Sequence, residues 1–286
     1  QDDFRVTPKL LLTFGLRYEY EQPPTERYNR SIQGFDSATP SPIESVVREN
    51  YGKNPIPEIN PQDFHVLGGL TFAGNPRQFW RGDRNNFQPR IGFADQLNPK
   101  TAIRGGFGIY NELVGTSRQQ ALLTGFSGQT ELVPSLDNGQ NFIATLANPF
   151  PGGISRGAGA AGGLNTFLGQ DVKFFNQRLV SPYVQRWQVS VQRQFGESII
   201  FELGYVGSKG IQLRTERDLN AIPEQYFSRS SERDQAAINF LSTNVPNPFY
   251  PLLPRTTLSG ANVSRGQLLK PFPQFNRITM QDNNGY

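Results

Sequence analysis

The stretch LLLTFGLRYEYE, residues 10–21, decides the fold of this 286-residue chain. In an extended chain every second residue lies on the same face, and one face here carries Leu10, Leu12, Phe14, Leu16, Tyr18 and Tyr20. The other face carries Leu11, Thr13, Gly15, Arg17, Glu19 and Glu21. This period-two alternation predicts a β-strand that is apolar on one side and polar on the other. Strands of soluble proteins are usually about five or six residues long, whereas a tilted strand that crosses a bilayer needs about 9–11.

The same alternation recurs in tight hairpins along the chain. The first hairpin joins residues 2–7 to residues 10–21 through Thr7-Pro8-Lys9. The second turns at Asn98-Pro99-Lys100 and the third at Gly196-Glu197, and a seventh strand is predicted to begin within residues 271–280. The fold class predicted is therefore all-β, an antiparallel transmembrane β-barrel segment of about seven long amphipathic strands.

Long polar stretches separate the hairpins, over residues 22–86, 113–181 and 210–270. Within them we expect a short strand at residues 65–72, a helix at 231–241 and a mobile glycine-rich loop at 151–163, with poor order elsewhere. Loops of this length are rare in compact soluble domains. Short turns at one end and long loops at the other are typical of outer-membrane barrels, with periplasmic turns and extracellular loops.

The composition argues against several classes of function. Hydrophobic residues make up 36% and the mean hydropathy is −0.50, so the sequence offers no apolar run for a membrane-spanning helix. There is no cysteine and a single histidine, His65, so we expect no thiolate metal site, no cofactor and no enzyme activity. The net charge of +4 is spread along the chain, which argues against nucleic-acid binding.

Four segments resemble a known family. They are residues 1–24 (QDDFRVTPKLLLTFGLRYEYEQPP), 85–110 (NNFQPRIGFADQLNPKTAIRGGFGIY), 181–210 (SPYVQRWQVSVQRQFGESIIFELGYVGSKG) and 268–275 (LLKPFPQF). In this order and spacing they are similar to the barrel of TonB-dependent outer-membrane receptors, in particular the Oar-like group with a carboxypeptidase-regulatory-like N-terminal domain.

The resemblance implies a transporter of the Gram-negative outer membrane, with a 22-stranded barrel that a plug domain occludes. Its partners would be outer-membrane lipid, the plug, the TonB complex and a substrate such as a siderophore, saccharide or peptide. With about seven strands, no plug, and Gln rather than Met at position 1, residues 1–286 are expected to be an internal fragment of such a barrel. Two alternatives stay open: a surface adhesion or display barrel, and a soluble β-rich carbohydrate-binding module.

The alternation assigns side chains to lipid or lumen. The predicted lipid-facing residues are Leu12, Phe14, Leu16, Ile91, Phe93, Phe107, Val189, Val191, Phe201 and Leu203. The predicted lumen-facing charges are Arg17, Glu19, Arg90, Arg104, Arg186 and Glu202. These charges either line a substrate path or simply solvate the lumen and pair with one another or with the plug. The second interpretation is favoured, because lumen walls are polar by default.

Aromatic residues near the strand ends predict a membrane-interface belt. Tyr18, Tyr20 and Tyr205 are the main candidates, and Tyr110 and Trp187 are further ones. Trp80 falls in a loop, where it either stacks on a substrate or, as is more common, fixes its own loop.

Overall fold

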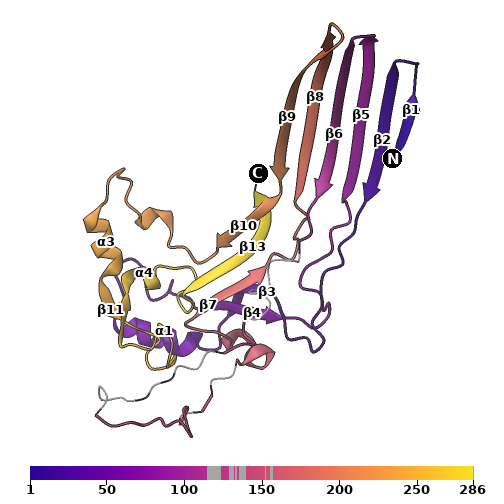
Figure 1. Ribbon diagram of the computed structural model, residues 1–286. Helices are drawn as coiled ribbons and strands as arrows, with labels where there is room; N and C mark the ends of the chain where they lie inside the picture. The colour runs from indigo at the N-terminus through magenta and orange to yellow at the C-terminus, as the bar shows by residue number, and fades with distance from the viewer. Residues whose placement is uncertain are drawn as a thin grey trace.

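The computed structural model describes residues 1–114, 124–128, 132, 134, 140–151, 153–154 and 157–285. It consists of a curved, open β-sheet that rises from a compact globular part (Figure 1). All three hairpin turns lie at the far end of the sheet, which we call the turn end. The globular part adjoins the opposite end, the loop end.

The open sheet has six antiparallel strands in the order β1-β2-β5-β6-β8-β9. The strands are β1 (Asp2–Arg5), β2 (Leu10–Tyr18), β5 (Phe87–Asn98), β6 (Thr101–Asn111), β8 (Tyr183–Phe195) and β9 (Ile199–Ile211). Strands as long as the 13-residue β8 and β9 agree with the membrane-crossing length that the sequence predicts. The predicted antiparallel sheet is confirmed, and it does not close into a barrel.

The tight turns follow from local chemistry. At the β5–β6 turn the Asn98 side chain accepts a hydrogen bond from the Lys100 backbone N–H, at 3.0 Å, which is a common way for asparagine to stabilise a turn. At the β8–β9 turn Gly196 has φ of 64°, a value that glycine adopts without steric cost. The hairpin positions predicted from sequence are therefore confirmed.

The globular part, which we call the loop unit, gathers the long stretches between the hairpins. Its strands are β3 (Ile32–Pro40), β4 (Leu67–Phe72), β7 (Asp171–Phe175), β10 (Leu213–Asp218), β11 (Asn244–Pro246), β12 (Asn262–Ser264) and β13 (Arg277–Gly285). Its helices are α1 (Glu44–Lys53), η1 (Gly159–Asn165), η2 (Glu224–Tyr226), α3 (Gln235–Ser242) and α4 (Arg265–Leu268). β3 pairs with β4, β11 with β12, and β13 lies between β10 and β7. The β13–β7 pair is parallel, an exception to the antiparallel pattern.

The loop unit has a hydrophobic core, so the expectation of poorly ordered loops is wrong for most of the described residues. Buried side chains come from all three long stretches and from residues 271–285: they include Val47, Tyr51, Phe64, Val66, Leu70, Val172, Phe174, Phe249, Leu268, Phe275 and Ile278. Tyr51 and Phe64 stack with ring centroids 3.9 Å apart. Full burial of each large apolar side chain contributes about 1.5–3 kcal/mol, which offsets the entropy lost in ordering such long loops.

The sequence expectations for these stretches are confirmed only in part. Part of the glycine-rich segment 151–163 lies outside the described residues, but its end enters η1, where Gly159 is buried. The helix expected at 231–241 is present as α3, whose N-terminal Asp234 accepts a hydrogen bond from the Ala237 N–H at 3.0 Å. Helices α1 and α4 were not predicted.

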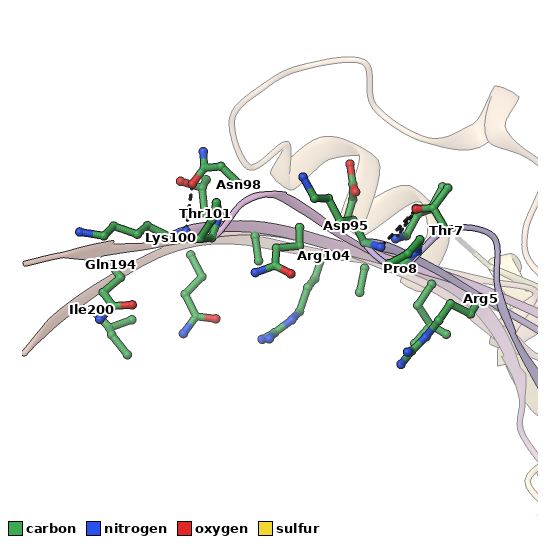
Figure 2. A pocket seen from close by; sticks show the side chains of 18 residues that line it. Arg5, Thr7, Pro8, Asp95, Asn98, Lys100, Thr101, Arg104, Gln194 and Ile200 are labelled. Atoms are coloured by element: carbon green, nitrogen blue, oxygen red, sulfur yellow. Dashed lines mark hydrogen bonds between the residues drawn. The ribbon is translucent and has the colours of Figure 1, made fainter. Parts of the chain in front are cut away.

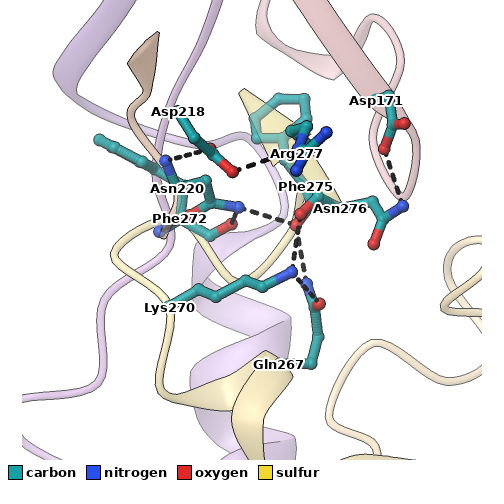
Figure 3. Close-up of polar contacts among 9 residues, drawn as sticks. All are labelled: Asp171, Asp218, Asn220, Gln267, Lys270, Phe272, Phe275, Asn276 and Arg277. Atoms are coloured by element: carbon teal, nitrogen blue, oxygen red, sulfur yellow. Dashed lines mark hydrogen bonds and ion pairs between the residues drawn. The ribbon is translucent and has the colours of Figure 1, made fainter. Parts of the chain in front are cut away.

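The seventh strand that was expected to begin within residues 271–280 is present as β13, but Phe275 does not belong to it. β13 begins only at Arg277, and Phe275 is fully buried in the loop-unit core rather than placed on a strand face. The preceding turn is held by a polar network (Figure 3). Asn220 donates to the carbonyls of Phe272 and Phe275, and Gln267 donates to those of Pro273 and Phe275, all at 2.7–3.1 Å.

Lys270 completes this network. Its Nζ donates to the Asn276 carbonyl at 2.7 Å and to Gln267 Oε1 at 2.8 Å. Burial lowers the pKa of Lys270, although the nearby Asp218 and Asp171 carboxylates act in the opposite sense. The turn therefore depends on a partly desolvated charge that is satisfied by an amide oxygen and a backbone carbonyl.

Replacing Gln267 with alanine is expected to destabilise the loop unit by about 2–4 kcal/mol. The side chain is 7% exposed, and its loss leaves two buried carbonyls with one hydrogen bond fewer, each costing about 1–3 kcal/mol. Limited proteolysis of the full-length protein at increasing urea concentration measures the change. Gln235→Ala is the control, because among the described residues the Gln235 side chain makes only an exposed hydrogen bond with Asn239 on α3. Equal proteolysis of the two variants would contradict the structural role of Gln267.

The loop unit is also expected to lose stability in acid through Asp36. The Thr39 hydroxyl lowers the pKa of this carboxyl most strongly, and the Thr39 and Ala38 N–H groups lower it further. Because the folded state favours the charged form, the stabilisation is present above the unfolded pKa of about 3.9. It is lost as the pH falls through the lowered folded value. Asp36→Asn should flatten the pH dependence of proteolysis below about pH 4, and Thr39→Val should move the transition to higher pH. Unchanged profiles would argue against this linkage.

Candidate functional site

The sheet presents two chemically different faces. The cross-strand register places Phe14 opposite Ile91, Ile91 opposite Phe107, and Phe107 opposite Trp187. Directly opposed residues project to the same side of a sheet. These pairings therefore show which residues of the six strands share one face. We call it the apolar face. It carries all ten residues that the sequence assigns to lipid: Leu12, Phe14, Leu16, Ile91, Phe93, Phe107, Val189, Val191, Phe201 and Leu203.

Most of the apolar face is exposed. Nine of these ten side chains are between 37% and 68% exposed, and only Leu12 is half-buried. Monomeric soluble proteins rarely expose contiguous apolar patches of more than a few hundred Å². A face of exposed Phe, Leu, Ile and Val across neighbouring strands is therefore suited to an apolar surrounding rather than to water.

The opposite, polar face carries the charged candidates. Arg90, Arg104, Arg186 and Glu202 lie on it by register, and so does Arg17. Glu19 lies just beyond β2, where its carboxylate contacts the Arg17 guanidinium and accepts a hydrogen bond from Gln88. Gln88 pairs with Arg17 in the register, so Glu19 stays on the polar side. An apolar face backed by a polar one is the arrangement of a barrel wall in a membrane.

The comparison with known families decides the assignment. A family model described as "Outer membrane beta barrel domain" matches residues 1–286. This chain belongs to the outer membrane beta barrel domain family. Comparison with curated proteins and with solved structures gave no match. Membership makes the protein an integral outer-membrane protein and excludes the alternative of a soluble carbohydrate-binding module. The predicted fold class is confirmed by the family match and the antiparallel sheet together.

The aromatic candidates of the barrel domain fall in three places. Tyr18, Tyr205 and Trp187 lie on the apolar face, and Tyr18 packs against Phe87 with ring centroids 5.0 Å apart. Tyr20 lies beyond the end of β2, near the Arg84 guanidinium at 5.8 Å. Tyr110 lies on the polar face, because its neighbour Ile109 occupies the apolar one, so its expected place in an interface belt is wrong.

Trp80 is buried in a small cluster of its own. Its ring packs edge-on against Phe175, with centroids 5.0 Å apart, and it is 3% exposed. Of the two roles weighed for it, the geometry matches a residue that fixes its loop. The indole face is not available to a substrate in this arrangement.

A shallow hollow of about 370 Å³ lies at the turn end of the barrel wall (Figure 2). Arg5, Arg104 and Ile200 project into it from the polar face, and Lys9 and Lys100 flank it on the turns. Asp95 is an acidic side chain of the lining, and it points to the other side of the sheet. The hollow is wide and open, so it is a cationic rim rather than an enclosed binding cavity.

Within the described part of the barrel domain, no three His, Asp or Glu side chains gather closely enough to hold a metal ion. His65 is exposed, and its Nδ1 lies 3.2 Å from Glu44 Oε1 at the start of α1. None of the described helices is long and apolar enough to span a bilayer.

Proposed function

We propose that this chain forms part of the wall of a TonB-dependent transporter, which takes up a substrate across the outer membrane. The observation that carries the proposal is the pairing of an exposed, largely apolar face with a polar face rich in arginine. In this proposal the ten apolar residues contact lipid, and Tyr18 and Tyr20 lie near the outer interface. Tyr205 lies opposite Val189 at the centre of β9, so its expected place at the interface is not met, and it faces lipid at mid-bilayer. The charged residues line a water-filled lumen, and no covalent chemistry takes place there.

The proposal also assigns an orientation and partners. The turn end would face the periplasm and the loop unit would lie outside the cell, as is usual for outer-membrane barrels. The lumen would receive a plug domain, which couples the receptor to the TonB complex. The compact core of the loop unit supports this arrangement, because rigid external loops hold a substrate at the barrel mouth better than disordered ones.

An energy-dependent uptake assay tests the proposal against a surface adhesion barrel. We expect disruption of the gene in its own bacterium to abolish uptake of one substrate among ferric siderophores, oligosaccharides and peptides. In the parent strain a protonophore should abolish the same uptake while cell-surface binding remains. In-cell cross-linking of the full-length receptor to TonB should yield an adduct. Surface binding without any protonophore-sensitive uptake, and without this adduct, would instead indicate adhesion.

A further inference from the structure

The polar face holds a cluster of three side chains, Arg90, Tyr110 and Arg186, which the sequence alone did not predict. In the register, Arg90 on β5 lies opposite Gly108 on β6, and Gly108 lies opposite Arg186 on β8. Two arginines on the same face are thus separated by one glycine. Arg90 and Arg186 each lie three positions from the end of their strand that adjoins the loop unit.

Tyr110 fills the space above this glycine. A Cβ atom at position 108 would lie 3.0 Å from atoms of the Tyr110 ring, which shows that the ring lies folded down over Gly108. The ring is therefore placed between the two arginines. The Arg90 guanidinium carbon is 4.8 Å from its centroid and that of Arg186 is 5.7 Å away. Both distances fall within the range of cation–π attraction, about 6 Å.

The two positive charges have no acidic partner within the described residues. No ion pair there involves Arg90 or Arg186, and the buried Nε of Arg90 has no hydrogen-bond partner. On the same face, the Glu19 carboxylate is already engaged by Arg17 and Gln88. Tyr110 is 39% exposed and Arg186 is also exposed, so the cluster is open to the lumen side. A buried N–H without an acceptor costs free energy that an oxyanion would recover.

We propose that Arg90, Tyr110 and Arg186 form a binding subsite for an oxyanion group, a carboxylate or phosphate, on the transported substrate. Arginine guanidinium groups bind such groups through two parallel hydrogen bonds, and the tyrosine ring holds both guanidiniums in place while its hydroxyl adds a donor. The inference rests on the proposed transport function and narrows its substrate to an anionic class. Gly108 is the positioning residue, because any side chain there displaces the ring.

Calorimetric titration of the purified full-length receptor in detergent tests the subsite, with citrate as the carboxylate probe and inorganic phosphate as the phosphate probe. We expect at least one of them to bind, and Arg186→Gln to weaken that binding by about tenfold or more, since a hydrogen bond to a charged group is involved. Arg5→Gln is the matched control. It removes the same charge from the same face at the turn end, and should change affinity by less than about twofold.

Two further variants separate positioning from charge. Gly108→Ala keeps both arginines but raises the ring, and should weaken binding by severalfold. Tyr110→Phe keeps the ring and should retain more affinity than Tyr110→Leu. Heat-modifiable migration of each purified variant checks that the barrel is folded, so loss of binding in a folded Arg186→Gln receptor reports on the site.

Specific results would overturn the subsite. Failure of the wild-type receptor to bind either anion would do so, as would equal weakening in Arg5→Gln and Arg186→Gln, which would indicate a general cationic lumen. Unchanged binding in Arg186→Gln would overturn it as well. Anion binding that is sensitive to Arg186→Gln, without energy-dependent uptake, would leave the subsite standing and refute the transport proposal. Energy-dependent uptake with no anion binding would support the transport proposal and refute the subsite.

Discussion

Replacing Val189 with arginine is expected to lower the yield of folded barrel sharply, at a cost of about 2–4 kcal/mol. Val189 is the central residue of β8, lies on the apolar face and is 44% exposed. In the membrane this position corresponds to mid-bilayer, where a charged side chain has neither water nor a counter-ion. The fraction of full-length protein that migrates in the heat-modifiable, folded form measures the effect.

The adjacent residue supplies the control. Gln188 lies on the polar face of the same strand and is exposed, so Gln188→Arg adds the same charge on the opposite side. We expect it to cost much less, because lumen positions of barrels accept charge. Equal losses in the two variants would mean that the two faces are wrongly assigned to lipid and lumen.

Replacing Phe275 with alanine is expected to destabilise the loop unit by about 3–5 kcal/mol, the usual cost of removing a buried phenylalanine from a core. Phe275 is 0% exposed and packs edge-on against Phe35, with ring centroids 5.6 Å apart. Its carbonyl also accepts hydrogen bonds from Asn220 and Gln267, so movement of its backbone would disturb the network of Figure 3.

Protease treatment of intact cells that carry the full-length protein measures this change. Under the proposed orientation, Phe275→Ala should make the loop unit cleavable at temperatures where the parent protein resists. The barrel should stay heat-modifiable, because Phe275 lies outside the six-stranded sheet. Phe227→Ala is the control, since Phe227 is 49% exposed and its truncation opens no cavity. Resistance of Phe275→Ala equal to that of the control would show that this core does not stabilise the loops.

The sheet was predictable from sequence because strand periodicity is local. Alternation in β2, β5, β6, β8 and β9 specifies which side each residue takes, and the register then carries this assignment across neighbouring strands. Tyr110 was assigned to the wrong side because the preference of tyrosine for membrane interfaces was given more weight than the alternation of side chains along β6. The adjacent Ile109 shows the correct side.

The loop unit was not predictable in the same way. Its core residues have no common period: Val47 and Tyr51 lie on a helix, Leu70 and Val172 on strands, and Phe249 in a turn. Their contacts connect distant segments, and no local pattern in the sequence indicates such contacts. The Arg90–Tyr110–Arg186 cluster escaped prediction for a related reason. It depends on which residues face one another across β5, β6 and β8, and only the pairing supplies that.

The parallel pairing of β7 with β13 constrains the order in which the protein can fold. Each hairpin of the sheet pairs residues that are close in sequence, so it can form as soon as its own two strands are available. The loop unit cannot form this early, because Asp171 pairs with Arg277 and the core contains Val47, Val172 and Ile278 together. The closure entropy of those long loops is recovered only when β13 arrives. The three hairpins of the wall can therefore form early, whereas the β2–β5 and β6–β8 pairings that join them require distant segments to meet. The loop unit forms later still, because it requires nearly the whole chain.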